Sequence, residues 1–452
     1  MTETTTAVNP PLGSAVIEPA RRLPVRAQAD VVVCGGGPSG FIAAVAAARA
    51  GASVLLLERY GFLGGMATAG LVGPLSKFNL GGERIVDGIP GEFIRALHAA
   101  GGAIIDLPSG NVPYDAELYK LTAQRLTRGS GAGILLHAQV AGAIASREEQ
   151  GRLTHVIIET KSGREAVAAN QFIDCTGTGD LVARSPLPCG MRNHRVDGGL
   201  QPMSLYFRLG GVDTDKLNVL MARDGTKYAN PELRAALADE VKAGRLRNFG
   251  GPWAVHGSTI RPGEVSVNAT RITGNAADAD DLSFSELVLR EEVPVMVDIF
   301  RRRHKAFANC YLMETAAQIG IRETRAIRGL YTLTAGDVLG ARPFPDSVAL
   351  GGHPIDMHRA DSSGQSVQFL TAPYQIPYRA LVPEGSENVL VAGGTLSATR
   401  EAFGSARVQA QCMALGQAAG VAAALCAQGG ESVSKLDGTA LSARLRADGA
   451  LV

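Results

Sequence analysis

The chain has 452 residues, and its 44 basic and 43 acidic side chains give a formal charge of +1 at pH 7. This length allows more than one hydrophobic core, and the balanced charge argues against nucleic acid or an anionic membrane surface as the main partner. The six cysteines include no C-x-x-C pair. We therefore expect a reduced, cytoplasmic protein without a disulfide framework or a metal site.

Two segments raise the question of a secretory signal or a membrane span. Arginines at positions 21, 22 and 26 interrupt the only stretch where a secretory signal could lie. The uncharged segment 408–430 contains four glutamines and mostly small residues, which is typical of a buried helix and unusual for a bilayer span. The sequence therefore predicts a soluble protein with a core helix at 408–430.

The first predicted elements form a β-α-β unit. A short β-branched strand at 30–33 leads into the turn CGGGPSG, and residues 41–49 have the alanine-rich composition of a buried helix. A second strand at 53–57 ends in Glu58. A glycine-rich turn in this context, with an acidic residue about 20 positions later, is typical of dinucleotide binding. The alternative is a glycine turn in an ordinary α/β fold.

The glycines of this turn have separate expected roles. Gly35 permits the tight turn, Gly37 lets a pyrophosphate approach the backbone, and Gly40 lets the helix and strand pack closely. The free N–H groups at the helix N-terminus then face the phosphates. Glu58 is expected to accept hydrogen bonds from an adenosine ribose.

Later segments indicate an interrupted domain. Five glycines between positions 61 and 73 suit close backbone approach to a bulky ligand, and three strand-like runs follow between 134 and 174. Residues 191–373 change to isolated strands and polar helical stretches, including a helix near 282–303. The strand signal ENVLVAGG then returns. We predict a first domain over 25–190 and 374–452, and an inserted mixed α+β substrate domain over 191–373.

Several motifs together resemble the FAD-dependent oxidoreductase family with the glutathione-reductase-type fold. They are VVVCGGGPSG, LLLERYGFLGGMATAG, FIDCTGTGDL, GIRETRAIRG, GGHPIDMH, IPYRALVP and ENVLVAGG followed by RVQAQCMALGQAAG. The resemblance implies a Rossmann-like α/β domain with a parallel sheet and a β-meander, and bound FAD. It implies cofactor contacts from Gly35, Gly37, Pro38, Ser39, Gly40, Glu58, Arg59, Gly65, Met66, Thr68, Val140, Thr176, Gly177, Gly393 and Arg407.

The sequence departs from this family pattern at two places. Related sequences often carry histidines where this chain has Arg400 and Phe403, which puts a proton-transfer role for that segment in doubt. Relatives with covalent flavin use a histidine or cysteine beside the glycine-rich loop, and GGMATAG offers neither. We therefore expect noncovalent FAD.

A flavin that oxidises a C–H bond needs a nearby base for the accompanying proton. His353 and His358 are the first candidates because they flank a proline-containing loop where the chain returns to the FAD-binding domain. Both could instead be loop or capping residues. His256, close to the only tryptophan, Trp253, is a further candidate for lining a pocket. Cys34 is expected to be a core residue, as is Cys175.

Arginines supply the remaining catalytic candidates. Arg322, Arg325 and Arg328 recur at every third position of an expected helix, where they could clamp a substrate carboxylate or form a solvated face. Tyr378 and Arg379 are weaker candidates.

Arg407 is expected to lie near the start of the helix that follows Gly404, with Ser405 as its N-cap, and to face the pyrimidine side of the flavin. A salt bridge from Arg407 to Glu401 is the alternative.

We predict an FAD-dependent oxidoreductase that transfers hydride between a small organic substrate and flavin N5. An isomerase or lyase without net redox change is an alternative, and so is an FAD-dependent RNA-modifying protein. The substrate, the electron acceptor and the oligomeric state are not indicated by the sequence.

Overall fold

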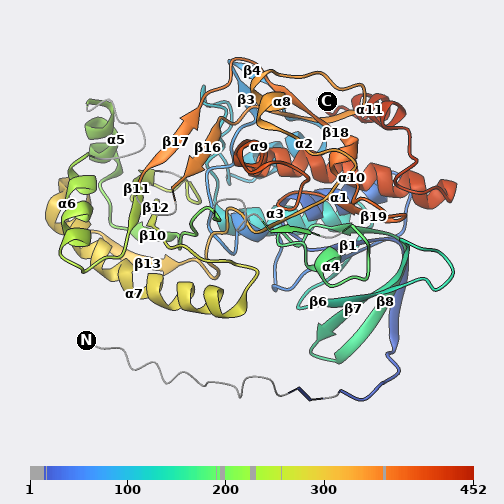
Figure 1. Cartoon of the computed structure of the whole chain (residues 1–452). Coiled ribbons are helices and arrows are strands. Elements are labelled where there is room, and N and C mark those ends of the chain that lie inside the picture. Colours follow the sequence, from blue (N-terminus) through green and yellow to red (C-terminus); the bar gives the residue numbers. More distant parts are fainter. Residues whose placement is uncertain are drawn as a thin grey trace.

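The computed structural model describes residues 15–16, 18–189, 191–193, 199–223, 231–255, 257–359 and 363–452. Its largest sheet has seven strands in the order β5–β2–β1–β8–β7–β6, with β19 also paired to β8 (Figure 1). The pairs β1–β2, β1–β8, β2–β5 and β8–β19 are parallel, whereas β6–β7 and β7–β8 are antiparallel. The predicted parallel sheet with a β-meander is therefore confirmed. The strand bounds are β1 Val25–Cys34, β2 Val54–Leu57, β5 Gly133–Leu135, β6 Gln139–Ala145, β7 Leu153–Thr160, β8 Gly163–Asp174 and β19 Val389–Val391.

Strand β1 shows why this sheet is central. Side chains alternate between the two faces of a strand, and both faces of β1 are covered. Val31 and Val33 pack into the core on the helix side, while Val32 and Cys34 pack into a second core under the meander. All four are fully buried. The apolar run before the glycine-rich turn is therefore a strand of the sheet interior.

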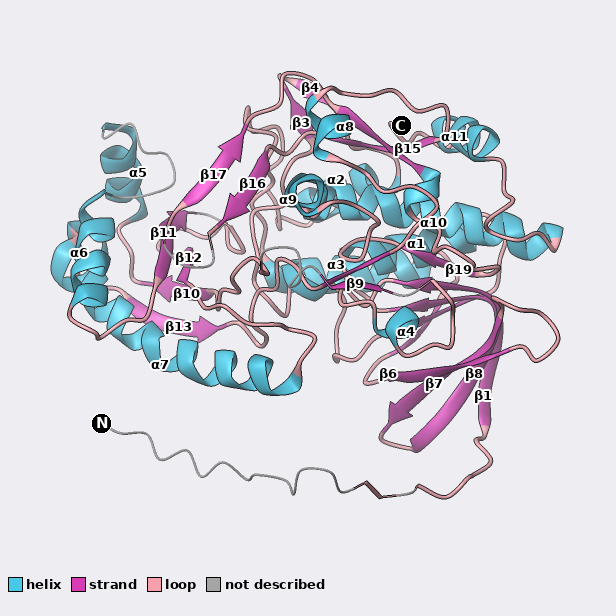
Figure 2. Ribbon diagram, in the orientation of Figure 1, coloured by secondary structure: helices cyan, strands magenta, loops and turns pink. Residues whose placement is uncertain are grey.

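Helices cover the sheet, and two from opposite ends of the chain touch backbone to backbone (Figure 2). A Cβ atom on Gly416 of α10 would lie 2.1 Å from the carbonyl oxygen of Ser39 in α1. Helix α10 is long and apolar enough to cross a membrane, but 89% of its most apolar window is buried inside the protein. It is the core helix that the sequence predicts. The helix bounds are α1 Pro38–Arg49, α2 Ile89–Ala99, α3 Ala116–Gly129, α4 Asp180–Ala183, α10 Gln409–Gly429 and α11 Gly438–Ala447.

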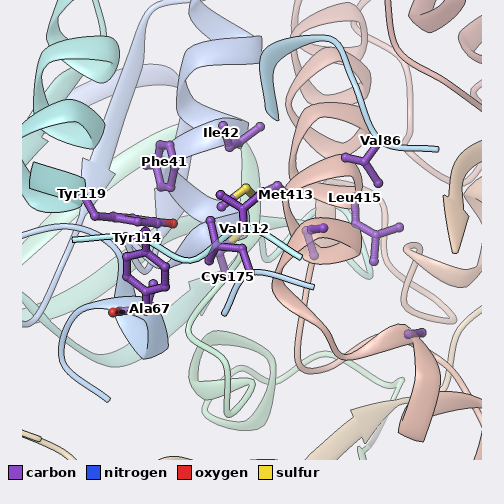
Figure 3. Close-up of a cluster of buried hydrophobic side chains, with 14 of the residues drawn as sticks. Phe41, Ile42, Ala67, Val86, Val112, Tyr114, Tyr119, Cys175, Met413 and Leu415 are labelled. Carbon is purple, nitrogen blue, oxygen red and sulfur yellow. Dashed lines mark hydrogen bonds between the residues drawn. The ribbon is translucent and has the colours of Figure 1, made fainter. Parts of the chain in front are cut away.

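An aromatic group fixes the position of α1 in this core (Figure 3). The ring of Phe41 lies 4.9 Å from that of Phe93 and 6.0 Å from that of Tyr119, between ring centroids, in edge-to-face geometry. Tyr114 donates its hydroxyl to the backbone carbonyl of Ala67 at 2.6 Å. These contacts bring α1, α2 and α3 together with the loop that follows β2.

A smaller antiparallel sheet in the order β11–β12–β10–β13 lies on the opposite side of the molecule, next to three helices (Figure 1). Its bounds and those of the helices are β10 Phe207–Gly210, β11 Phe249–Val255, β12 Val265–Thr270, β13 Tyr311–Thr315, α5 Thr214–Arg223, α6 Pro231–Lys242 and α7 Ala279–Arg303. One cluster of buried hydrophobic residues runs without a break from α1 to Phe207 and Phe300. The two-part domain division at residues 190 and 373 stays a prediction.

Short elements connect the two sheets. Their bounds are β3 Asn79–Leu80, β4 Glu83–Arg84, β9 Met191–Asn193, β14 Arg325–Ile327, β15 Ser347–Gly351, β16 Ile355–His358, β17 Gln365–Gln368, β18 Tyr374–Pro377, α8 Ala335–Leu339 and α9 Arg400–Ala406, with 3-10 turns at Gly65–Ala67, Lys305–Phe307 and Tyr378–Ala380. The helix expected at 320–329 is wrong, because Arg325–Ile327 pair with β9 as a strand. The buried side chains of Ala326 and Ile327 fit this sheet position.

Candidate functional site

A pocket with an empty volume of about 1080 Å³ runs across the carboxyl ends of β1 and β8. Both the glycine-rich turn after β1 and the first turn of α10 contribute to its wall. This edge of a parallel sheet is where open α/β folds bind ligands. Of the residues expected to hold a cofactor, the pocket is lined by Gly35, Gly37, Pro38, Ser39, Glu58, Arg59, Gly65, Met66, Val140, Thr176, Gly177, Gly393 and Arg407.

The three glycines of the glycine-rich turn differ in the space around them. One borders room for a ligand, and the other two have no room for a side chain. A Cβ on Gly40 would lie 1.7 Å from the carbonyl oxygen of Gly35, and a Cβ on Gly35 would lie 2.4 Å from that of Cys175. A Cβ on Gly37 would meet no protein atom closer than the Cα of Gly65, at 3.8 Å. Gly37 therefore borders open space beside the N-terminus of α1, which suits a pyrophosphate.

Glu58 ends β2 as a buried carboxylate. Its Oε2 accepts a hydrogen bond from the Gly36 amide at 2.6 Å, and its Oε1 accepts one from the Tyr60 amide at 2.8 Å. Burial raises the pKa of Glu58, and these two amides oppose that rise. Each oxygen retains a lone pair, so the carboxylate can accept hydrogen bonds from the two hydroxyls of a ribose.

Two residues expected to contact the cofactor, Gly40 and Thr68, make contacts within the protein. Gly40 packs α1 against β1, as the sequence predicts, and does not line the pocket. Thr68 is buried, and its hydroxyl donates to the carbonyl oxygen of Leu63 at 2.9 Å. The expectation that Thr68 lies along a ribityl chain is therefore not supported, because its one donor is used to close its own loop.

Side chains from segments far from the glycine-rich turn in the sequence also line the pocket. They include the polar residues Arg322, Arg407 and Gln409, together with Phe403. Arg407 follows α9, and its Nη2 lies 3.4 Å from Oδ2 of Asp356. Arg407 therefore pairs with Asp356, whereas the expected alternative partner was Glu401.

The expected cap of the next helix is wrong. Ser405 lies inside α9, and α10 begins at Gln409 with Val408 as its N-cap. The Ser405 hydroxyl is within 2.8 Å of the Tyr374 hydroxyl. The N-terminus of α10 still borders the pocket through Gln409 and Cys412.

His358 is held by hydrogen bonds on both ring nitrogens. Its Nδ1 lies 2.9 Å from Nη2 of Arg271, and its Nε2 lies 3.1 Å from Oδ2 of Asp356. A guanidinium can only donate, which assigns the ring proton to Nε2 and makes the imidazole neutral. Burial and the charge of Arg322 lower the pKa of His358 to about 3, although Asp356 opposes this shift. His358 therefore joins Arg271 to Asp356 and has no free nitrogen for a substrate proton.

His353 differs from His358 because a hydrogen bond is made at one of its ring nitrogens, Nδ1. Its Nδ1 lies 2.8 Å from the carbonyl oxygen of Pro354, so Nδ1 carries the proton and Nε2 carries the lone pair. Burial and the charge of Arg407 lower the pKa of His353 to about 4, which keeps the ring neutral at pH 7. His353 is not among the residues that line the pocket.

The remaining candidates lie apart from one another. Arg322 lines the pocket, Arg325 donates to the carbonyl oxygen of Thr178 at 3.2 Å, and Arg328 is exposed. The expected row of three arginines on one helix is therefore wrong. Arg325 contacts Thr178 and Asp180 of the pocket lining without lining it itself, and its catalytic role stays a prediction.

Three further candidates lie elsewhere. The Tyr378 hydroxyl donates to the carbonyl of Val433 at 2.8 Å, and Arg379 pairs with Asp346 at 2.9 Å. These two residues are structural. His256 lies outside the described residues.

Arg271 and Asp356 were not predicted from the sequence. Asp356 had a detectable signal, since it lies two residues before His358 and side chains two apart in a strand share one face. Arg271 directly follows β12 and is only 1% exposed. An isolated arginine after a strand carries no local sign of burial, so it could not be recognised from the sequence.

A parallel sheet, a glycine-rich turn beside open space and a buried carboxylate at the end of the second strand define a dinucleotide-binding flavoprotein. The chain matches the family described as FAD dependent oxidoreductase over residues 30–445. It belongs to this family, and FAD is its cofactor. The fit of Gly37 and Glu58 to a pyrophosphate and a ribose agrees with this assignment.

Similar proteins include several reductases. The chain is 30% identical over 166 residues to digeranylgeranylglycerophospholipid reductase 2 of Methanopyrus kandleri, covering 34% of this chain and 39% of that protein. It is 32% identical over 179 residues to the menaquinone reductase of Mycobacterium tuberculosis, covering 37% and 41%. The chain thus spans about two fifths of each of these relatives. A solved flavoprotein/dehydrogenase from Cytophaga hutchinsonii is 14% identical, with a TM-score of 0.47 over 90% of this chain and 80% of that one.

Proposed function

We propose that this protein catalyses hydride exchange between a small organic substrate and FAD bound in the pocket. The observation that carries the proposal is the extent of that pocket. Its wall combines the glycine-rich turn and Glu58 with Arg322, Phe403 and Arg407 from distant parts of the chain. When bound, FAD supplies a two-electron acceptor or donor that exchanges hydride at N5.

The residues of the chain have separate tasks in this proposal. Gly35, Gly37 and the amides at the start of α1 hold the pyrophosphate, and Glu58 accepts from the adenosine ribose. Arg407 and the N-terminus of α10 place positive charge on the pocket wall. We propose that the substrate meets the cofactor beside Arg322 and Arg407.

The two predicted histidines differ as proton acceptors. Nε2 of His353 has a lone pair and no hydrogen-bond partner among the described residues, whereas both nitrogens of His358 are already bonded. His353 does not line the pocket, so we assign the proton that leaves with the hydride to Nε2 of His353 by transfer through an intervening water. His358 positions Arg271 and Asp356.

Anaerobic reduction of the bound flavin tests this function. The purified protein is mixed without oxygen with alcohols, amines and hydroxy acids, and loss of the oxidised flavin absorbance is followed. We expect stoichiometric bleaching by a member of one class. Conversion of a compound without net flavin reduction would instead establish an isomerase or lyase. Acid precipitation of the same sample should release intact FAD, because we expect no covalent link.

A matched pair of variants tests the histidine assignment. His353→Gln should slow flavin reduction by roughly 100-fold or more, the usual contribution of a positioned base. His358→Gln keeps one acceptor and one donor for Arg271 and Asp356, so it should slow reduction far less. Equal rates for His353→Gln and the unmodified protein would remove His353 from the mechanism.

A further inference from the structure

Three arginines from different segments surround one carboxylate beside the pocket. This arginine cluster consists of Arg271, which follows β12, Arg322, which precedes β14, and Arg407, which lies between α9 and α10. Contacts run from Arg271 to His358 at 2.9 Å, from His358 to Asp356 at 3.1 Å and from Asp356 to Arg407 at 3.4 Å. Arg322 and Arg407 both line the pocket.

The cluster has more positive than negative charge. Each guanidinium is charged at pH 7, and His358 is neutral because Arg271 donates to its Nδ1. Among the described contacts of these groups, Asp356 supplies the one carboxylate. Among the described residues, Arg322 donates hydrogen bonds to the carbonyl of Pro202 and the hydroxyl of Ser204, both neutral.

This excess charge is buried. Arg271 is 1% exposed, and the side chain of Arg407 is 15% exposed. Burial and the charge of Arg322 lower the pKa of Arg271 to about 10. Buried charges cost free energy unless a counter-charge meets them. A cluster of three cations and one anion is therefore unbalanced without a further anion.

An unused donor shows where such an anion can bind. Nε of Arg407 is buried and has no hydrogen-bond partner among the described residues, and Arg407 lines the pocket. An unpaired buried donor is costly, and a guanidinium binds planar oxyanions through two parallel N–H groups. The FAD pyrophosphate is expected beside Gly37, where the amides at the N-terminus of α1 already meet its charge.

We infer that the substrate carries an oxyanion group, a carboxylate or a phosphate, that Arg322 and Arg407 on the pocket wall bind it, and that the buried Arg271 adds positive charge to the cluster without touching it. The inference rests on the proposed function, since it names the class of molecule that exchanges hydride with FAD. His358 and Asp356 are positioning residues in this arrangement, because His358 accepts a hydrogen bond from Arg271 and Asp356 pairs with Arg407.

Binding of simple oxyanions to the FAD-loaded protein tests the inference without turnover. Benzoate, benzamide, phenyl phosphate and phenol are titrated at constant ionic strength, and the flavin absorbance spectrum and the thermal midpoint are recorded. We expect benzoate or phenyl phosphate to bind at least tenfold more tightly than its neutral counterpart. The tighter of the two identifies the substrate group as a carboxylate or a phosphate. Equal binding of the charged and neutral compounds would overturn the inference.

Arginine variants then locate the binding site. Arg322→Gln should weaken oxyanion binding roughly 10- to 100-fold, the usual effect of losing a charge-assisted hydrogen bond, and Arg271→Gln, which removes a charge behind the site, should weaken it by a smaller factor. Arg379→Gln, which removes an arginine that pairs with Asp346 elsewhere, should bind as the unmodified protein does. If the glutamine variants lose FAD, Arg271→Lys and Arg322→Lys keep the charge and should lose less affinity. Unchanged affinity in the folded variants at both positions would overturn the inference.

The same variants separate this inference from the proposed function. Reduction of the flavin by a neutral compound, at a rate that Arg271→Gln and Arg322→Gln leave unchanged, would overturn the oxyanion assignment and support hydride exchange. Arginine-dependent binding of benzoate, together with conversion of a carboxylate without flavin reduction, would support the oxyanion site and overturn hydride exchange.

Discussion

Two parts of the pocket wall present charge in different ways: the glycine-rich end, formed by the turn after β1 and Glu58, and the arginine end, formed by Arg322 and Arg407. At the glycine-rich end, the groups available to a ligand are backbone amides at the start of α1 and one carboxylate, Glu58, whose oxygens already accept two amides. At the other end they are side chains, with Arg322 and Arg407 on the pocket wall and Arg271 behind them.

The difference indicates what each end selects. Backbone amides and glycines recognise a shape that does not change from one reaction to the next, and the pyrophosphate of a dinucleotide is such a shape. Buried arginines recognise charge, and a single substitution can change the charge that they require. The glycine-rich end therefore defines the cofactor, and the arginine cluster defines the substrate.

Blocking the glycine-rich end should have the largest effect. Gly37→Leu should reduce the FAD content to less than a tenth, because the new side chain enters the open space beside Gly37 and meets no protein atom nearby. Gly129→Leu at the end of α3 is a suitable control, since a Cβ there also has free space. The flavin-to-protein absorbance ratio measures the result, and normal FAD content in Gly37→Leu would mean that no pyrophosphate lies there.

The next effect concerns His358, which contacts Arg271 and should make the free energy of unfolding depend on pH. His358 has a pKa of about 3 in the folded protein, against an ordinary value of 6.5. Below pH 6.5 the unfolded chain therefore binds a proton that the folded chain does not, and the free energy of unfolding falls as the pH drops. At pH 5 this loss is about 2 kcal/mol.

His358→Gln should remove that loss. The difference in unfolding free energy between pH 7 and pH 5 should shrink by about 2 kcal/mol relative to the unmodified protein. Asp356 does not contribute in this window, because its pKa lies below the ordinary value of 3.8. Urea unfolding at the two pH values provides the measurement, with His155→Gln on β7 as control. An unaltered pH dependence would show that His358 is not held neutral.

The smallest expected effect is a change in the flavin midpoint potential when Arg407 is replaced. Arg407→Ala should lower the two-electron midpoint potential of the flavin by about 30 mV, equivalent to about 1.4 kcal/mol. A positive charge on the pocket wall favours the more negatively charged reduced form. Anaerobic titration with a reference dye measures the potential, and Arg379→Gln should leave it unchanged. A potential that does not move in Arg407→Ala would place this arginine away from the flavin ring.

Sequence reasoning succeeded where the determinants are local. The β-α-β unit, the meander and the core helix at 409–429 each depend on a continuous run of residues with a clear period or composition. The arginine cluster depends on contacts between residues 271, 322, 356, 358 and 407, and no local pattern encodes their meeting. Periodicity was also misleading at 322–328, where a three-residue repeat suggested a helix and pairing with β9 produced a strand.

The contact between α1 and α10 has a consequence for how the protein is made. The first turn of α10 completes the wall of the pocket, yet it is synthesised long after the glycine-rich turn. A chain still on the ribosome therefore has the turn that holds the pyrophosphate but lacks Gln409 and Cys412, and the apolar surface of α1 is uncovered. Flavin capture and burial of this surface must both wait for the C-terminal region, which makes the unfinished chain a natural client of chaperones.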